Sequence, residues 1–135
     1  MRLKHFDYSS NGAYFLTVCT DRRCSLLIGS ELEIAERELA ALEDRFAGLS
    51  LDCHEFMPDH LHAIVQLSGC SSTLSSIVQS YKSITTRDIK RLVQCDRVWQ
   101  RSFYDRIVRD EAELAALREY VVHNSIVHAV RGGAR

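Results

Sequence analysis

The chain has 135 residues, enough for one domain of ordinary size and too few for a (β/α)₈ barrel, which needs about 250 residues. Hydrophobic residues make up 46% and charged residues 26% of the sequence, a composition that excludes a disordered chain. The formal net charge of −1 excludes nucleic-acid binding through overall positive charge, so any basic surface must be local. No apolar run approaches the ~20 residues that span a bilayer, and we expect a cytoplasmic protein without a membrane partner.

The first half of the chain predicts a strand, a helix and a hairpin. Residues 14–20 are rich in aromatic and β-branched types, which favours a strand. Between residues 30 and 46, apolar residues recur at helical spacing among glutamates, so this segment predicts an amphipathic helix. Residues 49–56 and 60–67 predict two further strands. The single proline, Pro58, lies between them and suits the turn of a hairpin.

The second half predicts two more helices. Residues 71–92 carry apolar side chains mostly three or four apart, as an amphipathic helix does. Residues 97–107 contain several aromatic residues and predict either a fourth strand or a loop. The acids at 110 and 111 favour a helix N-terminus, and this last helix is expected to end near His123. A disordered tail is expected from about residue 129.

The order of these elements predicts one α+β domain over residues 1–135. Strand, helix, strand, strand, helix, strand is the order of a ferredoxin-like (RRM-like) fold. We therefore expect an antiparallel sheet with helices on one face and an additional C-terminal helix. Such a fold by itself names no activity.

His60 and His62 are the candidate metal ligands. Residues two apart on a strand point to the same side, so the two imidazoles share a face and can hold one divalent ion. Metal hydrolases built on (β/α)₈ barrels use the same spacing, and the length of the chain excludes them. A pair of solvated strand histidines would give the same pattern, and the spacing alone does not separate these alternatives.

Tyr120 is the candidate nucleophile, and it lies on the last predicted helix. Residues four apart stack on one side of a helix, so Asn124 shares a face with Tyr120, and His123 flanks that face. If Asn124 supplied a third ligand to an ion held by His60 and His62, the ion would lie beside the Tyr120 oxygen. This geometry suits phosphoryl transfer. The alternatives are a core aromatic residue at position 120 and a helix C-cap at position 124.

Basic and aromatic residues are interspersed between residues 80 and 109. Phosphates attract cations and unpaired bases stack on aromatic faces, so this pattern favours a single-stranded nucleic acid. The alternative is a solvated surface, because four aspartates dilute the positive charge. The candidate DNA contacts are Lys82, Arg87, Arg101 and Arg109.

These motifs together resemble the single-tyrosine HUH transposases, an IS200-like family, and most closely its REP-associated tyrosine transposase branch. The resemblance covers nearly the whole chain. It rests on the ordered motifs Met57-Pro58-Asp59-His60-Leu61-His62, Ser80-Tyr81-Lys82-Ser83, Val98-Trp99-Gln100-Arg101-Ser102-Phe103-Tyr104-Asp105, Arg109-Asp110-Glu111 and Arg118-Glu119-Tyr120-Val121-Val122-His123-Asn124.

The resemblance implies a reaction and a set of roles. His60 and His62 would be metal ligands, Asn124 would complete the metal site, and Mg²⁺ or Mn²⁺ would be the ion. Tyr120 would cut and rejoin single-stranded DNA beside hairpins through a covalent 5′-phosphotyrosine, and Tyr104 is a second candidate nucleophile. The chain departs from the family pattern at Asp59, where asparagine is common, and after Asn124, where proline is common.

Three further possibilities remain open. A relaxase or replication-initiator-like nickase would use the same chemistry. A non-catalytic module that binds single-stranded nucleic acid would use the same sheet without the chemistry. A homodimer with an exchanged C-terminal helix would build each active site from two chains.

Overall fold

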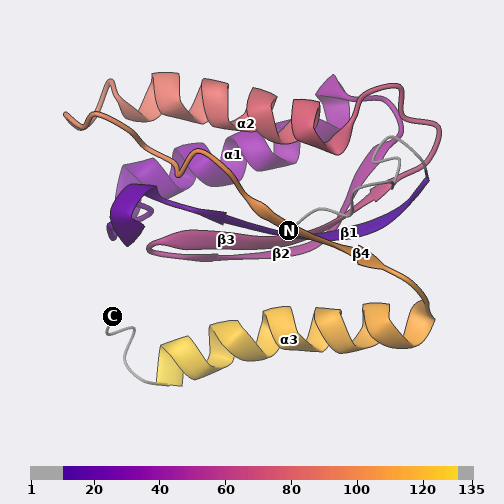
Figure 1. Ribbon diagram of the computed structural model, residues 1–135. Helices are drawn as coiled ribbons and strands as arrows, with labels where there is room; N and C mark the ends of the chain where they lie inside the picture. Colours follow the sequence, from indigo (N-terminus) through magenta and orange to yellow (C-terminus); the bar gives the residue numbers. More distant parts are fainter. Residues whose placement is uncertain (1–10, 131–135) are drawn as a thin grey trace.

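The computed structural model describes residues 11–130, with side chains up to residue 122. A four-stranded antiparallel sheet, in the order β2-β3-β1-β4, lies between two layers of helix (Figure 1). α1 and α2 cover one face of the sheet and α3 covers the other. The elements are β1 (Gly12–Cys19), η1 (Asp21–Arg23), α1 (Gly29–Arg45), β2 (Leu49–Met57), β3 (His60–Leu67), α2 (Leu74–Ile89), β4 (Tyr104–Val108) and α3 (Glu111–Val130). The predicted ferredoxin-like fold with one extra helix is confirmed.

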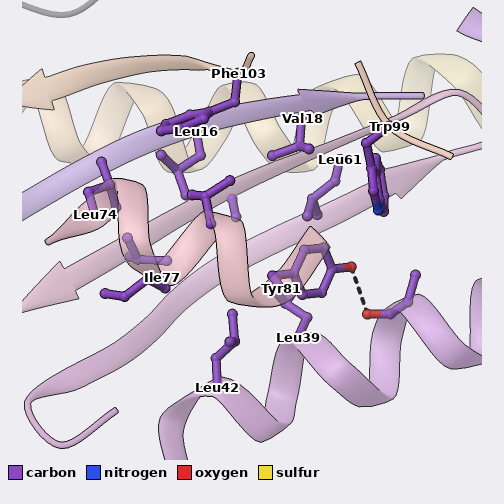
Figure 2. Close-up of a cluster of buried hydrophobic side chains, with 14 of the residues drawn as sticks. Leu16, Val18, Leu39, Leu42, Leu61, Leu74, Ile77, Tyr81, Trp99 and Phe103 are labelled. Carbon is purple, nitrogen blue, oxygen red and sulfur yellow. Dashed lines mark hydrogen bonds between the residues drawn. The ribbon is translucent and has the colours of Figure 1, made fainter. Parts of the chain in front are cut away.

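The main hydrophobic core lies between the sheet and the layer of α1 and α2. Alternate residues of the central strands point into it, because side chains along a strand alternate between the two faces. Tyr81 contributes its ring to this core, and its hydroxyl donates to the carbonyl of Ala35 on α1 at 2.9 Å. Figure 2 shows this packing for Leu16, Val18 and Leu61 of the sheet, Leu39 and Leu42 of α1, and Leu74, Ile77 and Tyr81 of α2.

The opposite face of the sheet carries a smaller apolar cluster beneath α3. Ile64 of β3 is fully buried there against Leu114 and Val121 of α3, with Phe15 of β1 at the edge. Burying each large aliphatic side chain contributes about 1.5–3 kcal/mol. These contacts hold α3 on the same side of the sheet as His60 and His62.

The segment before β4 is mostly a loop rather than a strand. β4 begins only at Tyr104, and earlier in the segment a single bridge pairs Trp99 with Thr20. The Trp99 side chain explains the loop, because it turns into the main core and its Nε1 donates to Thr85 Oγ1 at 2.8 Å. Of the two alternatives for residues 97–107, the loop is therefore correct for the first part and the strand from Tyr104 onward.

The last helix is longer than the sequence predicts. α3 continues to Val130 because no glycine or proline interrupts residues 111–130, so the expected end near His123 is wrong. Asn124 lies within the helix, which excludes a C-cap at this position. Residues 129 and 130, where a disordered tail is expected to begin, belong to α3, and residues 131–135 lie outside the described part.

No helix within residues 11–130 combines the length and the apolar run that a membrane span requires.

Candidate active site

His60 and His62 lie side by side at the start of β3. Both face α3, and both are buried, with 8% and 7% of their surface exposed. Their ring centroids are 4.7 Å apart, with the rings nearly perpendicular. The predicted shared face is confirmed, and burial excludes a pair of solvated strand histidines.

One ring nitrogen of each histidine is anchored by a neighbouring side chain. His60 Nδ1 lies 2.7 Å from Asp59 Oδ1, and His62 Nδ1 lies 3.0 Å from Thr17 Oγ1 on β1. In the tautomer in which Nδ1 donates these bonds, Nε2 of each ring carries the lone pair. Histidines that bind metal ions characteristically donate their second ring N–H to a carboxylate, carbonyl or water in this way. The donor chemistry of the pair therefore fits a divalent ion.

The environment keeps His62 neutral. The pKa of His62 is lowered to about 4, mainly by burial and to a smaller extent by the nearby charges of His60 and Arg23. A neutral imidazole keeps the lone pair that a metal ion requires. His62 is thus in the protonation state of a metal ligand at neutral pH.

Arg23 is a component of the site that the sequence reasoning missed. Its guanidinium pairs with Asp59, with Nη2 at 3.1 Å from Oδ2, and so braces the carboxylate that anchors His60. Arg22 and Arg23 both have a φ in the left-handed region, 56° and 55°. Such a conformation costs about 1 kcal/mol or more for a residue with a Cβ, and nothing in the residue types of this loop signals it.

Tyr120 lies beside His62. Its ring centroid is 5.6 Å from that of His62 and 6.1 Å from that of Phe15, both in edge-to-face arrangements. The side chain is 49% exposed, so the alternative of a core aromatic residue is wrong. The helix that carries Tyr120 lies on the sheet of its own chain, and no exchange between chains is needed to bring phenol and imidazole together.

A partly buried carboxylate on β2 holds α3 in this position. A β-bulge between Leu51 and Cys53 adds Asp52 to the strand, and its carboxylate reaches Arg118 of α3. The two side chains form a bidentate pair at 2.8 and 2.7 Å. Gln66 also donates to Asp52 at 2.6 Å. The Arg118 hydrogen bond is the main cause that lowers the pKa of Asp52, so the pair stays charged at neutral pH.

The other predicted ligand and its neighbour lie on the same helix. Asn124 and His123 both belong to α3, but their side chains are outside the described residues, and their roles stay predictions. Among the side chains that the structure describes, no three His, Cys, Asp or Glu residues converge as a metal site would need. A third protein ligand from Asn124 is compatible with this finding.

The four predicted DNA contacts do not form one patch. Lys82 is buried, and its ammonium donates to the carbonyls of Gln100, Arg101 and Ser102 at 2.8, 3.3 and 3.1 Å. Lys82 therefore holds the loop that carries Arg101. Arg87 is exposed, but its Nε lies 3.2 Å from Oδ1 of Asp88, with which it forms an ion pair.

Arg101 and Arg109 lie at opposite ends of the sheet. Arg109 follows Val108, the last residue of β4, which pairs with Ala13 near the start of β1. Cys19, which pairs with His60, lies at the opposite end of β1. Arg101 is exposed at the other end. It borders an open, polar cleft of about 490 Å³ between α2 and the loop, lined also by Gln79, Lys82, Thr86, Lys90, Asp96, Arg97, Val98, Trp99 and Gln100.

Comparisons with known proteins agree with this fold. The family described as "Transposase IS200 like" matches residues 8–124. Two proteins of Haemophilus influenzae are similar in sequence. An uncharacterized one is 27% identical, over 94% of this chain and 87% of its own length. One assigned as a REP-associated tyrosine transposase is 26% identical, over 90% of this chain and 74% of its own length.

Two solved structures are similar in fold. The structure of a REP-associated tyrosine transposase bound to a REP hairpin superposes with a TM-score of 0.73 and 19% identity, covering 95% of this chain and 74% of that one. A protein of Deinococcus radiodurans assigned as a transposase gives a TM-score of 0.63 and 19% identity, covering 90% and 97%. With a family match over most of its length, this chain belongs to the IS200-like transposase family.

Proposed function

We propose that this chain is a metal-dependent strand transferase that cuts and rejoins single-stranded DNA through Tyr120. The observation that carries the proposal is the position of Tyr120, half exposed, with its ring 5.6 Å from that of His62. A nucleophile has to be accessible to a polymer substrate and close to the groups that stabilise the developing charge. Tyr120 meets both conditions.

The reaction needs few groups from the protein. The Tyr120 oxygen attacks the phosphorus and loses its proton, the bond from phosphorus to the 3′-oxygen breaks, and the 3′-hydroxyl leaves. The 5′-phosphate remains bound to Tyr120 as a phosphotyrosine. Because this ester preserves the energy of the broken bond, a DNA 3′-hydroxyl can attack it later and reseal a strand.

His60, His62 and Asn124 would hold a divalent ion, Mn²⁺ or Mg²⁺. When bound, the ion neutralises charge on the non-bridging phosphate oxygens and aligns the phosphate with the nucleophile. Asp59 and Thr17 orient the two imidazoles, and Arg23 braces Asp59. Imidazole donors favour Mn²⁺ over Mg²⁺, which prefers a shell of oxygen ligands.

The proposed substrate is a single strand beside a hairpin. The relative of similar fold binds a REP hairpin, which supports this class of DNA. In this chain, Lys90, Arg97 and Arg101 line a cleft suited to the phosphates of a stem. The loop that borders the cleft is joined to the end of β1, where Gln100 N donates to Cys19 O at 2.9 Å. Cys19 pairs with His60, so the stem of the hairpin and the scissile phosphate at the histidine pair would lie at the same end of the sheet.

The experiment is a covalent-adduct assay. Purified protein is mixed with MnCl₂ and single-stranded oligonucleotides that carry the hairpins found beside its own gene, and adducts are separated on a denaturing gel. The wild-type protein is expected to form an adduct, and Tyr120→Phe to form none, because the variant lacks the attacking oxygen. Undiminished adduct in Tyr120→Phe would refute the proposal.

Two parallel samples separate the competing interpretations. Tyr104→Phe is expected to keep the adduct, whereas loss of the adduct in that variant would make Tyr104 the nucleophile. Salt-sensitive DNA binding by the wild type without any adduct, unchanged in His60→Ala, would instead favour a non-catalytic binding module.

A further inference from the structure

Tyr104 is an exposed aromatic residue on the face of the sheet that carries the histidine pair. The side chain is 59% exposed, more than any other large hydrophobic side chain among those described. On β4 it pairs with Thr17 of β1, and Thr17 pairs with His62 of β3. Directly paired residues point to the same face of a sheet. Tyr104, Thr17 and His62 therefore form one row across the sheet.

α3 explains why Tyr104 is exposed. The helix packs mainly against β2 and β3, so the outer part of the same face, at β4, is left uncovered. Between Tyr104 on β4 and Tyr120 on α3, the strand β1 presents Phe15 and Thr17, both partly exposed. An accessible surface with an aromatic ring at each side thus runs past the candidate nucleophile.

The position of Tyr104 does not suit a nucleophile. It lies two strands from His62, on the order of 10 Å at the usual strand spacing, whereas the ring of Tyr120 is 5.6 Å from that of His62. Its neighbour two residues along, Arg106, pairs with Glu113 at 2.6 Å, so the nearest cation on this row of β4 is already neutralised. What the surface offers to DNA is a ring face rather than a cation.

We propose that Tyr104 is a stacking platform for an unpaired base next to the scissile phosphate. Every base has an aromatic face, so stacking tolerates different sequences and needs no hydrogen-bond readout. One base stacked on Tyr104 would hold the strand over β1 and present the adjoining phosphate to Tyr120. This inference rests on the proposed function. It assigns Tyr104 as the position where the DNA strand enters the site.

The test compares three variants for binding to a fluorescein-labelled single strand of twelve thymidines, followed by anisotropy at constant salt. Tyr104→Leu removes the ring and keeps an apolar side chain, and it is expected to weaken binding at least about fivefold. Tyr104→Phe keeps the ring and is expected to stay within about twofold of the wild type. Leu92→Ala is the matched control, since Leu92 is also exposed, at 51%, and lies beyond the end of α2.

A second probe reports the stacking directly. A single 2-aminopurine placed in the thymidine strand loses fluorescence when it stacks, and this quenching is expected with wild type and Tyr104→Phe and reduced with Tyr104→Leu. Equal affinity and quenching for Tyr104→Leu and wild type would overturn the inference, as would an equal loss in both Tyr104 variants. Binding needs no covalent step, so Tyr120→Phe in the adduct assay tests the proposed function separately.

Discussion

Thr17 and Asp59 determine how the two imidazoles face the site. Each contacts the Nδ1 atom of one histidine, which leaves the Nε2 atoms of His60 and His62 for the proposed metal ion. Rings held in this way lose little conformational entropy on binding an ion. Thr17 in particular comes from a different strand, and its hydrogen bond joins His62 to β1.

Thr17→Val tests this role with a side chain of the same shape. Valine keeps the β-branch and removes only the hydroxyl. Mn²⁺ affinity, measured by titration calorimetry, is expected to fall about 10–100-fold, the usual effect of losing such an orienting hydrogen bond. His60→Ala is expected to abolish binding. Ser50→Ala, which removes an exposed hydroxyl elsewhere on the sheet, serves as the control, and wild-type affinity in Thr17→Val would contradict the role of Thr17.

At the scale of elements, the site depends on how α3 lies on the sheet. The β-bulge at Asp52 turns an extra side chain toward the helix, and Arg118 binds it with two hydrogen bonds. Arg118 and Tyr120 are two residues apart on α3, so the Asp52–Arg118 pair helps to set the position of Tyr120, together with the apolar contacts of Val121. A one-ångström displacement of a reacting group is enough to slow a reaction strongly.

Arg118→Ala is expected to lower the rate of adduct formation on the order of tenfold, because α3 loses its polar attachment to β2. Mn²⁺ binding at the histidines should change little. Adduct formation is followed over time on a denaturing gel at saturating DNA. The combined reversal Asp52→Arg with Arg118→Asp is expected to restore part of the rate.

A surface arginine provides the control for Arg118. Arg37 on α1 is similarly exposed and paired, with its Nη2 at 3.6 Å from Asp88, and Arg37→Ala is expected to react like the wild type. Equal rates for Arg118→Ala and Arg37→Ala would show that the Asp52 pair does not position Tyr120.

Several elements of the site could be predicted from local sequence patterns, and others could not. The shared face of His60 and His62 follows from strand alternation, and the i+4 relation of Tyr120 to Asn124 follows from helical spacing. The bulge that turns Asp52 toward α3 and the left-handed conformation of Arg23 depend on tertiary contacts, so no local pattern signals them. The sequence alone predicts that Lys82 is an exposed cation. In the structure Lys82 is buried, and its ammonium donates to the carbonyls of residues 100–102.

The three layers of the molecule place the main hydrophobic core and the histidine pair on opposite faces of the sheet. The main hydrophobic core lies between α1, α2 and the sheet, and the opposite face, beneath α3, carries His60 and His62 (Figure 1). The last helix returns over its own sheet, so Tyr120 and His62 come from one chain. We therefore expect each proposed active site to be built from one chain.

Mixing two inactive variants tests this assembly. One lacks both imidazoles, His60→Ala with His62→Ala, and the other is Tyr120→Phe. If each site is built from one chain, the mixture is expected to give no more adduct than the separate proteins on a denaturing gel. Recovery of adduct after mixing would indicate an exchanged helix, with the phenol of one chain beside the imidazoles of another.

The identity of the DNA-linked residue decides whether Tyr120 is the nucleophile. The covalent adduct is digested with trypsin and nuclease, and the peptide that retains a nucleotide is sequenced by tandem mass spectrometry. The nucleotide is expected on Tyr120, in the tryptic peptide that begins after Arg118. A nucleotide on Tyr104, or on any other residue, would contradict this assignment.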